Sequence, residues 1–231
     1  MKVAIIHARG NSKRIPKKNI KEFNGKPILA YPIETAEKSK LFDRIIVSTD
    51  SEEIALIAQE CGAEVPYLRP AALADDHTPT QEVLLHDIIQ LSKECDIHYA
   101  CCIYGTSVFC QQKQLHLGLE TLKRHQCSTA FSVTSFPCPI YRGLKINESG
   151  VLSMLYPEHR LTRSQDLPET YHDAAQFYWV DAMKYLKTPV LYSSDAMPVL
   201  IPRHLVQDID TNEDWKRAEY MYQSLKKGGE L

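Results

Sequence analysis

Two short segments at opposite ends of the chain combine residue types that can hold a polyanion and a metal ion. The first is a basic loop, residues 7–19, which directly follows an apolar run typical of a buried strand. Gly10 allows the backbone to approach a ligand closely, and Arg9, Lys13 and Lys18 can surround a phosphate chain with positive charge. Loops at the carboxyl ends of strands are the usual ligand sites of α/β sheets. The loop is therefore a candidate phosphate site.

The basic loop does not have the glycine spacing of the common phosphate-binding motifs. It matches neither G-x-G-x-x-G nor G-x-x-x-x-G-K-[ST], so the sequence does not support a dehydrogenase or a P-loop ATPase. A solvated surface loop is the alternative interpretation, because lysines are common on loops. The position directly after the first predicted strand favours the phosphate site.

The second segment, residues 207–215, contains an acidic pair in a D-x-D arrangement. Alternate residues of an extended segment share a face, so Asp208 and Asp210 should point the same way. Two carboxylates suit Mg²⁺, which leaves its other positions to water and phosphate oxygens. Alternatively, Asp210 or Thr211 caps the last helix, with Asp214 completing a variant capping box. Capping leaves Asp208 unexplained, so we predict a metal site here.

Composition limits the function classes further. The chain has 231 residues, 44% of them hydrophobic, which suffices for a single domain over residues 1–231. Residues 1–26 hold eight Lys or Arg and one Glu, yet the whole chain has a net charge of -2 and a pI of about 6.5. A nucleic-acid-binding domain would be more basic overall. The basic loop therefore suits a small polyanion such as a nucleoside triphosphate.

The sequence also carries expectations about location and cysteine chemistry. It has no apolar stretch of about 18 residues and no signal-peptide layout, so we expect a cytoplasmic protein without a membrane partner. The seven cysteines include no C-x-x-C pair and mostly lie in apolar surroundings. They are expected to be buried, reduced thiols rather than metal ligands.

Apolar runs alternate with segments of helical period, which predicts a doubly wound, Rossmann-like α/β domain with a mainly parallel sheet. Four prolines interrupt the pattern between about 136 and 175, where we expect an inserted arm with strand-like pieces at 142–146 and 151–155. The expected core strands are 2–8, 43–48, 63–68, 98–104, 130–134, 176–180, a piece near 190, and 197–201. The expected helices are 28–39, 51–61, 79–94, 111–125 and 212–226.

The basic loop contains the pattern A-R-G-x-S-K-R-x-P-x-K-N, which resembles the N-terminal motif of the acylneuraminate cytidylyltransferases, the CMP-sugar synthetases. Two later blocks, residues 47–55 and 69–80, resemble the second and third blocks of that family and occur in the same order. The resemblance covers nearly the whole chain. It implies a GT-A-like nucleotidyltransferase fold in which the arm, residues 136–175, mediates a homodimer.

The resemblance also implies a reaction: CMP passes from CTP to the anomeric hydroxyl of an acidic nine-carbon sugar, and pyrophosphate leaves. Such chemistry needs positioning and charge neutralisation more than a covalent nucleophile. By this resemblance Arg9 and Lys18 are catalytic, with Lys18 stabilising charge at the α-phosphate, and Asp208 and Asp210 hold catalytic Mg²⁺ or Mn²⁺. The implied nucleotide-binding residues are Arg9, Gly10, Ser12, Lys13, Lys18, Asn19, Arg69, Thr80, Thr106 and Ser107. The sequence departs from the family at Gly105 and Val108, where proline is usual.

The segments 163–167 and 171–179 lie where the family recognises its acceptor. They resemble the pseudaminate cytidylyltransferases more than the sialate enzymes, so we expect pseudaminic acid, a bacterial sialic-acid-like sugar. An unbroken strand would direct Gln176 and Tyr178 to one side. Ala175 stands where glycine is commoner. The expected sugar-binding residues are Arg163, Gln165, Tyr171, Gln176 and Tyr178.

Other hypotheses remain open from the sequence. The acceptor can instead be N-acetylneuraminate, legionaminate or a shorter 3-deoxy sugar acid, and the protein can be a non-catalytic regulator that binds CTP. A nucleic-acid-binding module is disfavoured by the acidic remainder of the chain. A hydrolase built on His172 and Asp173 is disfavoured because no G-x-S-x-G nucleophile motif occurs. For His7, a structural role at the solvent edge is favoured over phosphate contact or base chemistry.

Overall fold

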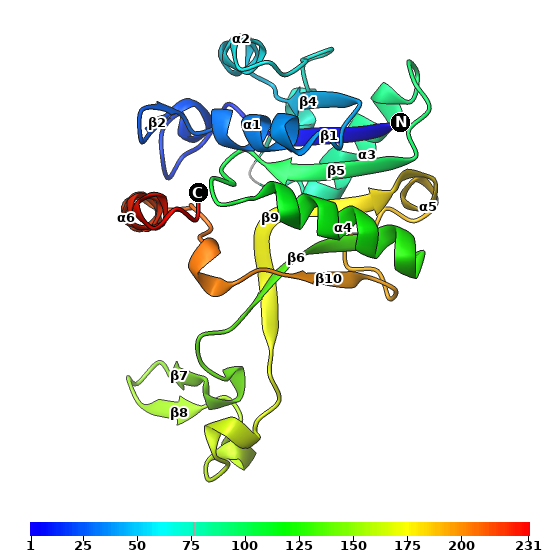
Figure 1. Cartoon of the computed structure of the whole chain (residues 1–231). Coiled ribbons are helices and arrows are strands. Elements are labelled where there is room, and N and C mark those ends of the chain that lie inside the picture. The colour runs from blue at the N-terminus through cyan, green and yellow to red at the C-terminus, as the bar shows by residue number, and fades with distance from the viewer. Residues whose placement is uncertain (76) are drawn as a thin grey trace.

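A computed structural model describes residues 1–75 and 77–231 and contains one central six-stranded sheet. The strand order is β10-β6-β9-β5-β1-β4 (Figure 1). Strand β9 is antiparallel to both neighbours, and the other pairs are parallel. This confirms the predicted mainly parallel α/β sheet. The strands are β1 Lys2–His7, β4 Arg44–Ser48, β5 Tyr99–Tyr104, β6 Thr129–Ser135, β9 Tyr171–Asp181 and β10 Met197–Leu200.

Helices cover both faces of the sheet because the strands are apolar on both sides. In β1, Ala4 and Ile6 belong to one buried cluster, and Val3 and Ile5 belong to another on the opposite face. The first cluster contains residues of α1, α2, α4 and α6, and the second contains residues of α3 and α5. The protein is therefore doubly wound. The helices are α1 Ala30–Ser39, α2 Glu52–Glu60, α3 Thr80–Leu91, α4 Gln112–His125, α5 Ala182–Lys187 and α6 Asn212–Gly228.

The arm projects from the body beneath β6 and β9 (Figure 1). It contains an antiparallel hairpin of β7, Leu144–Ile146, and β8, Leu152–Met154. The predicted arm ran to residue 175, but β9 begins at Tyr171 and pairs with β6 from there, so the arm ends near residue 170. The remaining short elements are β2 Glu22–Phe23, β3 Lys26–Pro27 and 3-10 turns at Lys18–Ile20, Ala71–Leu73, Ile140–Arg142, Pro157–His159, Ser164–Asp166 and Arg203–Leu205.

Three sequence-based element predictions were wrong. Residues 63–68 form no strand beyond a single bridge between Glu64 and Ile46, because Pro66 has no amide proton to extend the pairing. The segment near 190 is irregular, and the short helix α5 was not predicted. Among the described residues, no helix is both long enough and apolar enough to cross a membrane.

Helix α4 lies unusually close to β9 at Gly118. A Cβ atom at Gly118 would approach Cδ1 of Trp179 to 2.5 Å. Trp179 is fully buried, donates its indole N–H to the Leu115 carbonyl at 3.0 Å and stacks on Phe42. Neither partner can move without disturbing the core, so only glycine fits this crossing.

We expect Gly118→Ala to lower the free energy of unfolding by about 1 to 3 kcal/mol, since overpacking against Trp179 outweighs the better helix propensity of alanine. Gly228→Ala is the matched control, because a Cβ there meets only Glu230 Oε1 at 3.8 Å. Urea unfolding of both variants measures the difference. A Gly118→Ala protein as stable as the control would show that the close crossing is not rigid.

Candidate functional site

A cavity of about 360 Å³ lies at the carboxyl ends of β1 and β5. These strands are parallel neighbours whose last residues, His7 and Tyr104, are in register, so the loops that follow them emerge side by side. Eight of the predicted site residues line this cavity: Arg9, Lys18, Asn19, Arg69, Thr80, Thr106, Asp208 and Asp210. The other lining residues are His7, Leu73, Asp75, Thr78, Val83, Tyr104 and Gly105.

Four predicted nucleotide-binding residues do not line the cavity: Gly10, Ser12, Lys13 and Ser107. Gly10 lies against α2, where its amide donates to Asp50 at 2.7 Å and a Cβ would approach Ser51 Cβ to 2.9 Å. Ser107 is buried and donates to the Gln176 carbonyl at 3.0 Å. Gly10 and Ser107 thus support the loops around the cavity. Asp76, part of the predicted 69–80 block, lies outside the described residues.

Gly105 allows three segments of the cavity wall to converge. Its amide donates to the His7 carbonyl at 3.0 Å, and a Cβ would lie 2.9 Å from Asn19 Oδ1. Asn19 in turn donates to the Arg9 carbonyl at 2.9 Å. The end of β1, the Lys18 turn and the loop after β5 therefore meet at one point. A small residue there is required by this contact.

The basic loop and the acidic pair meet across the cavity. Lys18 Nζ donates to the Ile209 carbonyl at 2.6 Å and lies 3.3 Å from Asp210 Oδ1. Arg14 also pairs with Asp210, at 2.9 Å. Lys18 and Asp210, which are 192 positions apart in the sequence, thus compensate each other's charge.

Asp208 has a different environment from Asp210. Its side chain is exposed to the cavity, but nearby protein atoms exclude part of the water that would otherwise surround it. That partial burial, together with the negative charge of Asp210, raises the pKa of Asp208 above its ordinary value. A cation between the two carboxylates would relieve this repulsion.

The donor chemistry fits a hard divalent cation such as Mg²⁺. Among the described residues no group of three or more His, Cys, Asp or Glu side chains is arranged to hold a metal, so any ion at Asp208 and Asp210 must take its other ligands from water or a phosphate chain. Thr211 and Asp214 do form the capping box of α6. Capping therefore uses Asp214 and leaves Asp208 and Asp210 facing the cavity.

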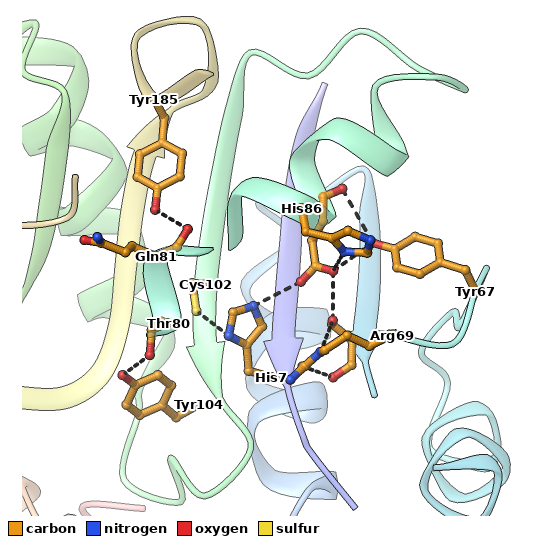
Figure 2. Close-up of polar contacts among 11 residues, drawn as sticks. His7, Tyr67, Arg69, Thr80, Gln81, His86, Cys102, Tyr104 and Tyr185 are labelled. Carbon is orange, nitrogen blue, oxygen red and sulfur yellow. Dashed lines mark hydrogen bonds and ion pairs between the residues drawn. The ribbon is translucent and has the colours of Figure 1, made fainter. Parts of the chain in front are cut away.

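A buried polar network that includes His7, Tyr67 and Arg69 adjoins the cavity (Figure 2). It centres on Asp87. The carboxylate of Asp87 is fully buried and accepts hydrogen bonds from Ser48 at 2.9 Å and Tyr67 at 3.0 Å, with His7 Nε2 at 3.1 Å. Burial alone would raise the pKa of Asp87, but hydrogen bonds from the two neighbouring histidines hold it well below its usual range. Arg69 donates to Ser48 Oγ at 3.1 Å and to the Ser48 carbonyl at 2.6 Å. The network thereby fixes the guanidinium that lines the cavity.

His7 belongs to this network and is not available as a base. One ring nitrogen faces Asp87, and the other lies 3.5 Å from the sulfur of Cys102. Burial lowers the pKa of His7 below its ordinary value, with the Arg69 charge acting in the same direction. The imidazole is therefore held neutral with both nitrogens occupied. This agrees with a structural role, but the side chain is only 10% exposed and does not lie at the solvent edge as predicted.

A second cavity of about 360 Å³ adjoins the first and shares Asp208 with it. Its lining includes two arginines, Arg203 and Arg217, together with Thr134 and Asp173. None of these four was selected from sequence as a binding residue. Arg217 occupies an exposed position of α6 and looks like an ordinary surface residue, so no local signal marks it. The other lining residues are Ser135, Pro137, His172, Ala174, Val206 and Gln207.

The structure separates the predicted sugar-binding residues. Between Phe131 and Val133 the register of β6 against β9 shifts, and Ala175 adopts φ of +51° in the region that favours glycine. This bulge breaks the regular alternation of side chains that would otherwise point Gln176 and Tyr178 to the same face of the sheet. Gln176 is buried, donates to the Leu205 carbonyl at 2.6 Å and lines neither cavity, whereas the Tyr178 hydroxyl donates to Asp173.

The remaining predicted sugar-binding residues lie on the arm or at its base. Arg163 is paired with Asp166 at 2.7 Å, and the Tyr171 hydroxyl donates to Glu169 at 2.7 Å. Arg163, Gln165 and Tyr171 line neither of the two cavities. Within one chain they are therefore not part of the site that the core strands form.

Comparison with known proteins agrees with this geometry. The family model for cytidylyltransferases matches residues 3–223. The pseudaminic acid cytidylyltransferase of Campylobacter jejuni subsp. jejuni is 37% identical over 221 residues, which is 95% of each chain. CMP-N,N'-diacetyllegionaminic acid synthase of the same species is 30% identical over 229 residues, covering 96% of this chain and 94% of the other. The structure of CMP:2-keto-3-deoxy-manno-octonic acid synthetase complexed with CTP superposes with a TM-score of 0.70 at 13% identity, covering 96% and 98% of the two chains.

The fold and the cavity at the strand ends are those of a nucleotide-using α/β enzyme, and the chain belongs to the cytidylyltransferase family. It is a nucleotidyltransferase. The resemblance noted at the basic loop is thereby confirmed.

The lowered pKa of His7 predicts a pH dependence of stability. As pH falls through the ordinary histidine value of 6.5, the unfolded chain takes up a proton at His7 that the folded protein does not. The free energy of unfolding should therefore fall, by at most about 1.4 kcal/mol per pH unit from this group. Urea unfolding at pH 7.5 and 5.5 measures it. Between these two pH values, His7→Gln should lose less stability than the wild type. The control His125→Gln changes an exposed residue and should lose as much as the wild type. Equal losses in all three proteins would contradict the role of His7.

Proposed function

We propose that this protein transfers CMP from CTP to the anomeric hydroxyl of pseudaminic acid and releases pyrophosphate. The observation that carries the proposal is the meeting of Lys18 with the Asp208–Asp210 pair in a cavity that adjoins a second, arginine-lined one. The acceptor assignment is supported by the pseudaminic acid cytidylyltransferases among the relatives at 37% identity. A cytoplasmic location is part of the proposal, because CTP is a cytoplasmic nucleotide.

The first cavity is assigned to CTP. Arg9 and Lys18 supply positive charge for the triphosphate. Arg69, whose guanidinium is held in place by Ser48, supplies hydrogen-bond donors for the base. When CTP enters, Lys18 exchanges its contact with Asp210 for the α-phosphate, where negative charge grows as the bond to pyrophosphate breaks. No protein nucleophile is needed, because the sugar hydroxyl attacks phosphorus directly.

Asp208 and Asp210 are the residues that would hold the metal, which we propose to be Mg²⁺, with Mn²⁺ as an alternative. When bound, the ion would neutralise phosphate charge and lower the barrier to the departure of pyrophosphate. Without it, the two carboxylates would repel the triphosphate.

The second cavity is assigned to the acceptor. Arg203 and Arg217 offer two guanidinium groups for the sugar carboxylate, a pairing that favours forked hydrogen bonds. The cavity adjoins the nucleotide cavity at Asp208, so a sugar bound there would be close to the triphosphate.

We also propose that the protein is a homodimer joined through the arm. The arm exposes a set of large apolar side chains, of which Leu161 is 85% and Ile146 71% accessible. Clustered exposure of this kind marks protein interfaces. Sedimentation of the whole chain should give about twice 26.4 kDa, and a monomer at micromolar concentration would count against the assignment. The other exposed apolar arm residues are Leu144, Val151, Leu152 and Leu155.

Pyrophosphate release from CTP and Mg²⁺ tests the proposed reaction, with pseudaminate, N-acetylneuraminate and legionaminate offered separately. We expect release with pseudaminate, at a kcat/KM at least about tenfold above that with the other two. Release only with another sugar would keep the reaction and overturn the acceptor. Binding of CTP without release for any sugar would favour the regulator hypothesis.

Two neighbouring aspartates separate the metal role from helix capping. Asp210→Asn should lower kcat by at least about 100-fold with little change in the free energy of unfolding, because it removes a metal ligand from the cavity edge. Asp214→Ala should instead cost about 1 kcal/mol of stability through the lost cap and keep most of the turnover. Steady-state kinetics and urea unfolding of both variants distinguish the metal role from the capping role. Full activity in Asp210→Asn would remove the metal assignment.

A further inference from the structure

The buried carboxylate of Asp87 does not line the nucleotide cavity, yet one hydroxyl group links it to a residue that does. The Ser48 hydroxyl donates to Asp87 Oδ1 at 2.9 Å and accepts the Nε–H of Arg69 at 3.1 Å. Arg69, shown in Figure 2, lines the cavity, whereas Asp87 and Ser48 are fully buried behind it. A buried negative charge is therefore connected to a positive charge in the cavity wall.

The chemistry of the three groups fixes the direction of this link. A serine hydroxyl has one proton, so donation to Asp87 leaves only the oxygen lone pairs to face Arg69. Burial would raise the pKa of Asp87, but hydrogen bonds from His7 and His86 hold it well below its usual range, and the carboxylate stays ionised. An ionised acceptor binds a hydroxyl proton more strongly than a neutral one. Asp87 therefore keeps the Ser48 oxygen available as an acceptor for Arg69.

Arg69 needs this support because it is a buried cation without a direct carboxylate partner. It is only 6% exposed, and its hydrogen bonds to described residues go to the hydroxyl and the carbonyl of Ser48. Burial lowers the pKa of Arg69, and the negative charges of Asp87 and Asp50 act in the opposite direction, that of Asp87 more strongly. A buried charge is costly unless an opposite charge compensates it. Asp87 supplies that compensation through Ser48.

The guanidinium of Arg69 keeps donors for a ligand while its plane is fixed. Ser48 holds Nε at 3.1 Å and Nη2 at 2.6 Å, so two contacts to one residue define the orientation. Nη1 donates to no described residue and is not fully enclosed by the protein. A guanidinium carries five N–H donors in a rigid plane, so the unused ones point in fixed directions. Fixed donors suit the edge of a base better than a flexible phosphate chain.

A fixed donor distinguishes the two pyrimidine bases by their chemistry. Cytosine presents neighbouring acceptors at O2 and N3, whereas uracil carries a proton on N3. A guanidinium that faces this edge gains a hydrogen bond with cytosine and meets another N–H with uracil. A donor left unpaired in this way costs binding free energy, so the wrong base is rejected. The discrimination is lost if the guanidinium can turn away.

We infer that Asp87 is a positioning residue for base recognition: through the Ser48 hydroxyl it holds Arg69 in the orientation that selects CTP over UTP. The inference rests on the proposed function, since it takes the first cavity as the nucleotide site. Asp87 does not contact the nucleotide and acts only through its neighbours. Tyr67 provides the contrast, because it donates to the same Asp87 oxygen at 3.0 Å but makes no hydrogen bond with Ser48 or Arg69.

Calorimetric titration with CTP, and with UTP by competition, tests the inference with Mg²⁺ present and without any sugar. The measured quantity is the ratio of the two dissociation constants, because loss of the Asp87 charge changes phosphate affinity equally for both nucleotides. The preference for CTP should fall at least about fivefold in Ser48→Ala and at least about threefold in Asp87→Asn. The double variant should lose no more than Ser48→Ala, because both residues act along one chain of contacts.

Tyr67→Phe is the matched control. It removes a hydrogen bond to Asp87 and should lower the urea midpoint of unfolding, but it should keep the CTP preference within about twofold of wild type. An unchanged preference in Asp87→Asn, additive losses in the double variant, or the same loss in Tyr67→Phe would overturn the inference. Equal weakening of CTP and UTP would also overturn it, because that indicates a purely structural role.

Two further outcomes are separable from these. If Asp87→Asn does not fold, the comparison of Ser48→Ala with Tyr67→Phe decides, and equal preferences in the two would overturn the inference. A wild type that binds UTP as tightly as CTP would overturn it as well. Absence of pyrophosphate release in wild type with every sugar rejects the proposed reaction, whereas the nucleotide ratios are measured without sugar and test only the role of Asp87.

Discussion

The balance of charge between Lys18 and the Asp208–Asp210 pair is the constraint on which the rest of the site depends. Asp210 is compensated by Lys18 and Arg14, while the neighbouring Asp208 has a raised pKa. A triphosphate brings several negative charges to the same place. Under the proposed function, the cations turn to the phosphates when the triphosphate enters, and the proposed metal ion would compensate the carboxylates in their place. The proposed function therefore couples nucleotide binding to metal binding.

The surrounding fold keeps these groups in place while their partners change. Register between β1 and β5 brings their loops to one edge of the sheet, and Gly105 lets the Lys18 turn pack directly against them. Beneath them, Asp87 is fully buried and compensated by several donors, so the floor of the cavity does not depend on the ligand. Rigid donors of this kind cost little reorganisation when charge develops.

Local patterns in the sequence predicted much of this arrangement. The basic loop and the D-x-D pair each carry their signal within a few residues, and the apolar periodicity located most core strands and helices. What depended on distant contacts was not predicted. The bulge at Ala175 directs the side chains of Gln176 and Tyr178 to different partners, and no pattern in the sequence predicts this bulge. Arg203 and Arg217 look like surface residues, but the 3-10 turn Arg203–Leu205 and α6 bring them to the second cavity. The role of the arm residues is a prediction that a single chain does not test.

Calorimetric titration of CTP, with and without Mg²⁺, tests the charge balance most directly when wild type is compared with a variant carrying both Asp208→Asn and Asp210→Asn. In wild type, Mg²⁺ should tighten CTP binding at least about tenfold, which corresponds to about 1.4 kcal/mol. In the double variant the metal should have little effect, and metal-free CTP should bind more tightly than to wild type because the repelling carboxylates are gone. This crossed pattern is the result that the account predicts. The same gain from Mg²⁺ in both proteins would contradict it.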